Sequence, residues 1–381
     1  MIVPRRRLLV SAAALLVSLS GVALLGPRTA VAADSLPRRL SDRAFWRMVV
    51  DFSEAEGTFR SENLISNERT FQEVIPELAK RVTPGGVYLG VGPDQNFTYI
   101  ASLRPRMAFI VDIRRQNMMQ HLLYKAIAEM SDDRADFLSR LFARPRPAGL
   151  ARSAAPQTLL DAYAGVPADE TLFQKNFEGI MNRLTMRHGF ALSPEDRRGI
   201  EYIARAFFAE GPALTYAYPR QQVGARMFPS YAELMTATDL AGLHRSYVAN
   251  EESFRILRDL ERNNLLVPIV GDFAGDKAVR AVGRYIRERG ATVNFFYTSN
   301  VEQYLFQGDL FQRFYSNVAT LPVDGHSTFI RSFFDRGFRY PPGITTADLH
   351  SVQLLDPIAD SVGAFQAGQI RTYENLVERS K

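Results

Sequence analysis

The sequence contains no cysteine, and its basic residues are almost all arginine, with only five lysines. Without cysteine the chain forms no disulfide, no zinc–thiolate site and no thiolate nucleophile. No two of its five histidines stand at a spacing typical of metal ligands, so we expect no metal cofactor. These are His121, His188, His244, His326 and His350. A chain without cysteine also suits export into an oxidising compartment, because it has no thiols to mispair there.

Acidic residues are absent from residues 1–33. Three arginines, Arg5 to Arg7, precede an apolar run over 8–26, and Ala30-Val31-Ala32 follows as a small-residue cleavage site. This pattern predicts a signal peptide over 1–33 and an extracytoplasmic location, periplasmic or secreted, for the rest of the chain. An uncleaved anchor is the alternative, because the run approaches the length of a spanning helix. The arginines admit the twin-arginine export route as well as general secretion.

The chain after the predicted signal has almost no net charge. Four of the 46 basic residues lie in residues 1–33, so 42 basic and 41 acidic residues remain, a net charge of +1. A protein that binds nucleic acid or an anionic membrane surface usually carries a basic excess. We therefore expect a small-molecule ligand and neither nucleic acid nor, once the signal is cleaved, a membrane as partner.

The most informative segment is a glycine turn between two apolar runs. Residues 87–91 read as a buried strand that enters a turn at Gly90 and Gly92, and a helical segment over 97–103 follows. A second strand over 108–111 ends at Asp112. A strand, a Gly-x-Gly turn, a helix and a second strand closed by a carboxylate together bind nucleotide-like cofactors in Rossmann-type sheets.

The remainder of the chain predicts one α/β domain over 34–381. Its doubly wound, mostly parallel, Rossmann-like sheet would be interrupted by a long helical insertion at about 131–264. We also expect helices over 67–81, with a kink or an early turn at Pro76, and over 115–130. Later strands are expected at 265–270, 292–297, 318–323 and 328–334, the last two as an antiparallel edge pair.

These segments resemble the class I S-adenosylmethionine-dependent methyltransferase fold. In that resemblance Gly90 and Gly92 match the cofactor loop, Asp112 matches the acidic end of the second strand, and Asp272 falls after the fourth. Tyr88 stands where an acidic residue usually opens the motif, and Asp94 replaces a third glycine. Much of the chain is also similar to an uncharacterised family of bacterial proteins, often exported.

The candidate site residues follow from this arrangement. Cofactor contacts are expected from Gly90, Gly92, Asp94, Asn96 and Asp112. Contacts to a substrate are expected from Asn63, Asn67, Asp272, Tyr297 and Asn300. Two motifs are absent: Ser299 and Ser327 lack the G-x-S-x-G elbow of serine hydrolases, and no Walker loop occurs.

Two functions remain open. The first is an exported protein whose methyltransferase-like pocket binds a nucleotide-like or small polar ligand without turnover. The second is an active S-adenosylmethionine-dependent methyltransferase on an unknown acceptor, in which S-adenosylmethionine is the cofactor. The sequence does not decide whether the protein is an enzyme.

Overall fold

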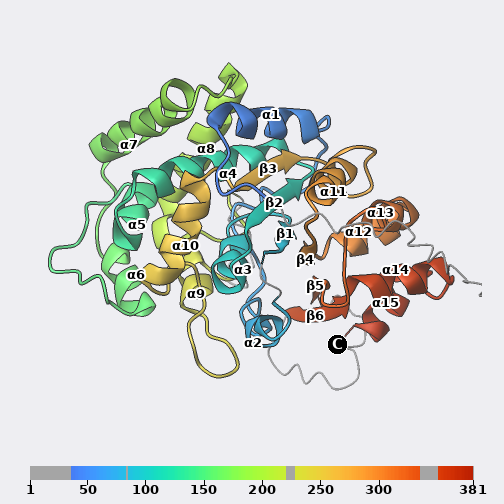
Figure 1. Cartoon of the computed structure of the whole chain (residues 1–381). Helices are drawn as coiled ribbons and strands as arrows, with labels where there is room; N and C mark the ends of the chain where they lie inside the picture. The colour runs from blue at the N-terminus through green and yellow to red at the C-terminus, as the bar shows by residue number, and fades with distance from the viewer. Residues whose placement is uncertain (1–35, 83–84, 220–227, 335–350, 381) are drawn as a thin grey trace, which may run out of the picture. The chain divides into compact units, whose positions relative to one another are not determined.

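The computed structural model describes residues 36–82, 85–219, 228–334 and 351–380, which belong to one compact unit spanning residues 33–381. The predicted signal peptide, residues 1–33, lies outside the described residues. The fold is α/β, built on one six-stranded, mostly parallel mixed sheet (Figure 1).

The sheet has the strand order β3-β2-β1-β4-β5-β6. All neighbouring strands run parallel except β5 and β6, which pair antiparallel. The carboxyl ends of β1 to β5 therefore meet at one edge of the sheet. The strands are β1 (Val87–Gly90), β2 (Met107–Asp112), β3 (Leu266–Val270), β4 (Val293–Ser299), β5 (Thr328–Phe334) and β6 (Ser351–Pro357).

The first half of the sheet forms as predicted. Strand β1 continues through the glycine turn into α3 (Gln95–Leu103), and β2 leads to α4 (Arg115–Met130), whose bounds match the prediction. Both strands are buried throughout. Helix α1 (Asp42–Phe52) is capped by the side chain of Ser41, which accepts a hydrogen bond from the backbone N–H of Ala44.

The segment between α4 and β3 is helical, as expected. Side chains cap several of its helices: Ser193 and Ser230 form capping boxes, and Asn250 accepts from the N–H of Ser253. The helices are α5 (Arg134–Phe142), α6 (Pro156–Ala164), α7 (Glu170–Asn182), η1 (Arg183–Arg187), α8 (Pro194–Glu210), η2 (Gly211–Ala213), α9 (Tyr231–Thr236) and α10 (Glu251–Arg262).

Three sequence-based expectations are wrong. Only Ile75–Ala79 of the expected helix over 67–81 is helical (α2), because Pro76 stands in the first turn of this helix. Of the polar residues before the helix, Asn67 and Glu68 line a cavity instead. Residues 318–323 form no strand, since Val318 ends α13 (Phe311–Val318). Asp272 follows β3, an edge strand, and not the fourth strand of the sheet.

Helices cover the sheet from two sides (Figure 1). Helix α4 packs on β2 and β3 and is itself covered by α8 and α10, whereas α1 contacts β3 and α11 (Ala278–Glu288). Phe52 of α1, Phe109 of β2 and Tyr285 of α11 form one aromatic cluster within the second group. The remaining helices are α12 (Val301–Gln307), α14 (Ile358–Gln366) and α15 (Tyr373–Arg379).

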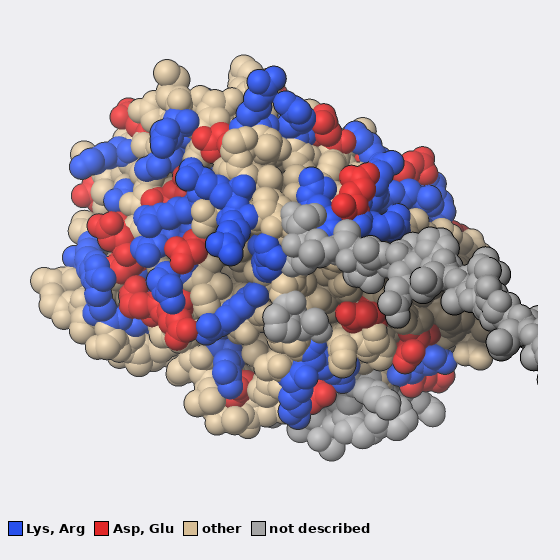
Figure 2. Space-filling model, in the orientation of Figure 1, with Lys and Arg blue, Asp and Glu red and all other residues tan. Residues whose placement is uncertain are grey.

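Surface charge is mixed on the face that Figure 2 shows, where basic and acidic side chains lie interspersed. Among the described residues, no helix combines the length and the apolar character needed to cross a membrane.

Candidate functional site

A cavity of about 330 Å³ lies at the carboxyl edge of the sheet. Its wall includes residues directly after β1, β2, β3 and β4, and one side is closed by the polar segment that precedes β1. Parallel strands direct their carboxyl ends to one edge, which is where open α/β sheets hold ligands. The position agrees with the expectation drawn from Gly92 and Asp112.

Six of the ten candidate residues line this cavity. They are Asn63, Asn67, Gly92, Asp112, Asp272 and Asn300. Asn300 occupies the N-cap position of α12, yet its side chain makes no capping hydrogen bond. Capping therefore does not account for the Asn300 amide at the cavity. The ligand contacts assigned to these six residues stay predictions, but the fold does bring the residues together.

The glycine turn is held from behind by Asn96. Its Nδ2 donates hydrogen bonds to the carbonyls of Val91, Gly92 and Pro93, at 2.9, 3.2 and 2.7 Å. A Cβ on Gly90 would stand 2.0 Å from Asn96 Oδ1, so glycine is needed there for packing. Gly92 has φ +79° and faces the cavity, where backbone without a side chain lets a ligand approach closely.

Asp112 is paired with Arg114. The Asp112 carboxylate accepts hydrogen bonds from the Arg114 backbone N–H, Nε and Nη2 at 2.9, 3.0 and 2.8 Å. Both side chains are more than nine-tenths buried, so this ion pair lies in the protein interior. A carboxylate has about four acceptor positions. One position on Asp112 Oδ2 therefore remains for a ligand hydroxyl.

Four candidate residues support the wall without lining it: Gly90, Asn96, Asp94 and Tyr297. Asp94 is buried among aromatic residues and accepts a hydrogen bond from the Tyr247 hydroxyl at 3.0 Å. Burial raises the pKa of Asp94 to about 7, against the lowering effect of the Tyr247 bond. Tyr297 donates to Glu68 at 2.7 Å and accepts from Gln95 Nε2 at 3.0 Å.

Glu68 is the main site residue that the sequence analysis missed. It lines the cavity at 1% exposure, and its Oε1 accepts hydrogen bonds from the hydroxyls of Tyr297 and Ser299. Burial raises its pKa, an effect opposed by its hydrogen-bond donors. Glu68 lies in the polar stretch before β1, and β1 pairs with β4. The sequence shows the polar stretch but not this strand pairing, so it does not indicate that Glu68 would meet the end of β4.

The described lining of the cavity carries more acidic than basic side chains. Glu68, Asp112 and Asp272 are acidic, and Arg114 is the one basic residue among the described lining residues. The Oε1 of Gln95, which is 4% exposed and also lines the cavity, has no hydrogen-bond partner. An unsatisfied buried acceptor is unfavourable, so a ligand with N–H or O–H donors or a positive charge would be stabilised here.

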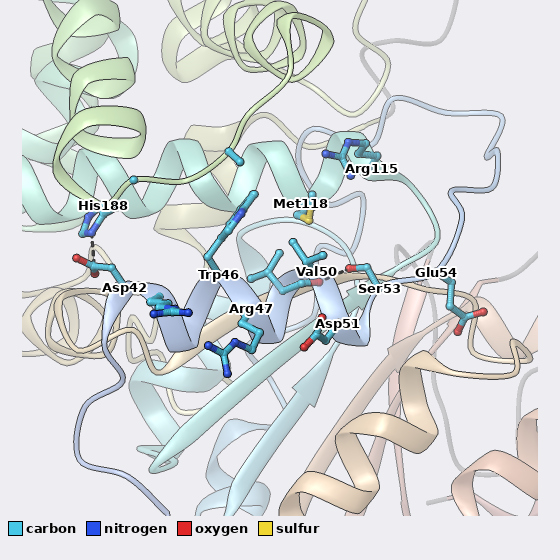
Figure 3. Close-up of a pocket in the computed structure, with 14 residues that line it drawn as sticks. Asp42, Trp46, Arg47, Val50, Asp51, Ser53, Glu54, Arg115, Met118 and His188 are labelled. Atoms are coloured by element: carbon cyan, nitrogen blue, oxygen red, sulfur yellow. Dashed lines mark hydrogen bonds and ion pairs between the residues drawn. The ribbon is translucent and has the colours of Figure 1, made fainter.

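A larger hollow of about 730 Å³ lies beside α1 (Figure 3). Two of its charged groups are already paired: His188 Nδ1 lies 2.9 Å from Asp42 Oδ1, and Arg115 forms a bidentate ion pair with Asp196. Figure 3 shows Trp46 pointing from α1 toward the chain after His188. The hollow is larger than the cavity at the strand ends, but among the described residues no buried side-chain atom without a hydrogen-bond partner belongs to its lining. The smaller cavity is the stronger candidate.

A domain of unknown function (DUF7790) matches residues 64–185 and 209–360, more than half of the chain. No curated protein matches the sequence. Within the described residues, no three His, Asp or Glu side chains come together in a way that could hold a metal ion.

Proposed function

The chain belongs to the DUF7790 family, and we propose that it binds a small, polar, nucleoside-like ligand without phosphate groups in the cavity at the carboxyl ends of β1 to β4. One observation carries the proposal: Gly92 and Asp112, at the ends of adjacent parallel strands, line the same cavity. The strand order 3-2-1-4-5-6 supports a Rossmann-like sheet, in which ribose hydroxyls meet the carboxylate after the second strand.

The lining charges favour ligands without phosphate. Three carboxylates line the cavity, and Arg114, the one arginine among the described lining residues, is paired with Asp112. A diphosphate would bring negative charge against Glu68 and Asp272, and the described part of the lining holds no further cation to offset it. Gln95 Oε1 and the remaining acceptor position on Asp112 Oδ2 would both accept hydrogen bonds from donor groups of a ligand.

The second candidate function is methyl transfer from S-adenosylmethionine. This cofactor is a sulfonium cation with an ammonium group, so its charge is opposite to that of the carboxylates. Methyl transfer depends mainly on holding acceptor and sulfonium in line. Asp272 and Asn300 line the cavity where an acceptor would lie, whereas Tyr297 stands behind the wall.

Export belongs to the same proposal. The arginines at 5–7, the apolar run and Ala30-Val31-Ala32 support a cleaved signal and a periplasmic or secreted protein. N-terminal sequencing of the extracytoplasmic protein would detect a mature end near residue 33, and finding Met1 there would reject cleavage.

Calorimetry with S-adenosylmethionine, S-adenosylhomocysteine and NAD tests the ligand class. We expect the first two to bind and NAD, with its diphosphate, to bind far more weakly. Gly92→Val should abolish binding, because its side chain would enter the cavity. Gly149→Val is the matched control, since Gly149 has a similar φ of +73° but nothing within 4 Å of its Cβ position and no place in the cavity lining. If none of the three ligands binds below millimolar concentration, the adenosyl part of the proposal fails.

A further inference from the structure

We propose that Ser299 and Glu68 form a nucleophile–base pair in this cavity, which transfers the acyl group of an uncharged or cationic ester onto Ser299. Both side chains line the cavity, and the two oxygens lie within hydrogen-bond distance. The inference goes beyond ligand binding. It needs the cavity but not the identity of the ligand proposed above.

The backbone at Ser299 presents its hydroxyl at the sheet edge. Ser299 ends β4, Asn300 follows, and α12 begins at Val301. Its φ is +51°, a left-handed conformation uncommon for residues other than glycine, and the pairing of β4 with β5 shifts register just before it. A nucleophile on a strained turn between a strand and a helix is how α/β-hydrolases expose their serine.

This turn forms without the glycines of the G-x-S-x-G motif. Tyr297 and Val301 stand at the two glycine positions. Tyr297 does not line the cavity, and its hydroxyl donates to Glu68. The sequence therefore lacks the pattern that usually marks a serine nucleophile, although the backbone at Ser299 has the strand-to-helix turn that such a nucleophile needs.

Glu68 is placed to take the Ser299 proton. The Ser299 hydroxyl donates to Glu68 Oε1 at 2.5 Å, and Tyr297 donates to the same oxygen. Gln353 Nε2 approaches the other oxygen at 3.3 Å. These donors fix the carboxylate, as the third member of a catalytic triad fixes its base.

Glu68, like Asp94, has no cation beside it, whereas most other buried carboxylates among the described residues are paired with one. Arg331 pairs with Glu302 and Asp356, Lys125 with Glu129, and Arg114 with Asp112. Among the described residues no basic side chain pairs with Glu68. A carboxylate without a cation, in a desolvated position, is a stronger base than one that is paired.

The chemistry balances with water as the second reactant. Ser299 Oγ bonds to the ester carbonyl carbon while its proton passes to Glu68. The bond from that carbon to the leaving oxygen then breaks, and Glu68 returns the proton to the alcohol. Water hydrolyses the acyl-serine by the same route. The amides of Asn63, Asn67 and Asn300 line the cavity and supply N–H donors for the oxyanion. Asp112 and Asp272 disfavour anionic esters.

Labelling with phenylmethanesulfonyl fluoride, followed by peptide mass spectrometry, tests the pair in the intact protein. We expect Ser299 to be sulfonylated faster than the exposed Ser316, and Glu68→Gln to slow this reaction by on the order of 100-fold. Glu252→Gln is the matched control, because it makes the same substitution at an exposed residue that pairs with Arg104 and has no place in the cavity lining. This variant should leave labelling of Ser299 unchanged.

The pH profile tests the base without depending on the stability of a variant. In the wild-type protein, labelling of Ser299 should increase with pH as Glu68 ionises, whereas labelling of Ser316 should not follow that curve. Labelling of Ser299 no faster than Ser316, or an unchanged rate in folded Glu68→Gln, overturns the proposal. Labelling needs no natural ligand. A protein that binds no adenosyl compound but labels at Ser299 would therefore refute the proposed ligand class alone.

Discussion

The hydroxyl of Tyr88 donates a hydrogen bond to Asn96 Oδ1 at 2.8 Å, inside the turn that joins β1 to α3. Both side chains are fully buried. The Asn96 amide nitrogen meanwhile holds three carbonyls of the same turn. Tyr88, which departs from the methyltransferase pattern, thus has a structural role: it orients the residue that shapes the glycine turn.

Replacing Tyr88 with phenylalanine tests this role. Tyr88→Phe leaves Asn96 Oδ1 buried without its donor, and we expect the free energy of unfolding to fall by about 1–3 kcal/mol. Urea denaturation measures the change. Tyr99→Phe is the matched control, because Tyr99 is equally buried but its hydroxyl has no partner, so its removal should cost little. Equal losses in the two variants would contradict the role of the Tyr88–Asn96 bond.

Gly90→Ala should destabilise the same turn. The added Cβ would lie 2.0 Å from Asn96 Oδ1 and 2.8 Å from Tyr88 Cε1, so Asn96 must move and loosen its carbonyl bonds. We expect a loss of about 1–3 kcal/mol in the free energy of unfolding, as for other overpacked sites. Gly363→Ala in α14 meets nothing within 4 Å and should stabilise by up to about 1 kcal/mol. Thermal and urea unfolding of both variants would show opposite signs.

Local patterns predicted the first half of the fold because each signal there is carried by neighbouring residues. The Gly90–Gly92 turn and the carboxylate of Asp112 fall at strand ends that the apolar runs mark directly. Local patterns also explain why the strand expected at 318–323 is wrong. A short apolar run by itself does not distinguish a strand from the end of a helix such as α13. Strand β6 was not predicted at all.

The site was predictable only in part, because half of its wall is assembled across the sheet. Glu68 and Ser299 are 231 residues apart and meet because β4 pairs with β1. No spacing in the sequence encodes that strand order. Asp94 and Tyr297 were expected at a ligand because they are polar and close to strand ends. Their orientation depends on partners such as Tyr247 and Glu68, which only the packing reveals.

The buried Asp112–Arg114 pair makes Asp112 important for stability. Asp112→Asn would leave the Arg114 guanidinium buried without its counter-charge, and we expect a loss of about 3–5 kcal/mol in the free energy of unfolding. The double variant Asp112→Asn, Arg114→Met should lose less, since it removes both charges. Glu252→Gln, in an exposed pair with Arg104, should change stability by no more than about 1 kcal/mol. Equal losses in the single and double variants would contradict an unpaired charge as the cause.

Asp94 predicts a pH dependence of stability whose sign is fixed by its burial. Because burial raises the pKa of Asp94 from 3.8 to about 7, the native state keeps a proton that the unfolded chain releases. Native stability therefore falls as the pH rises through this window, and the loss is complete above about pH 7.

The variant Asp94→Asn isolates this effect, because Asn resembles the protonated carboxyl and does not titrate. The stability of Asp94→Asn relative to wild type should thus increase by up to about 1.4 kcal/mol per pH unit across the window and then level off. Urea unfolding of both proteins at several pH values measures this difference, and taking the difference cancels the titration of other groups. A difference that stays constant from about pH 4 to about pH 7 would show that Asp94 is ionised in the native protein despite its burial.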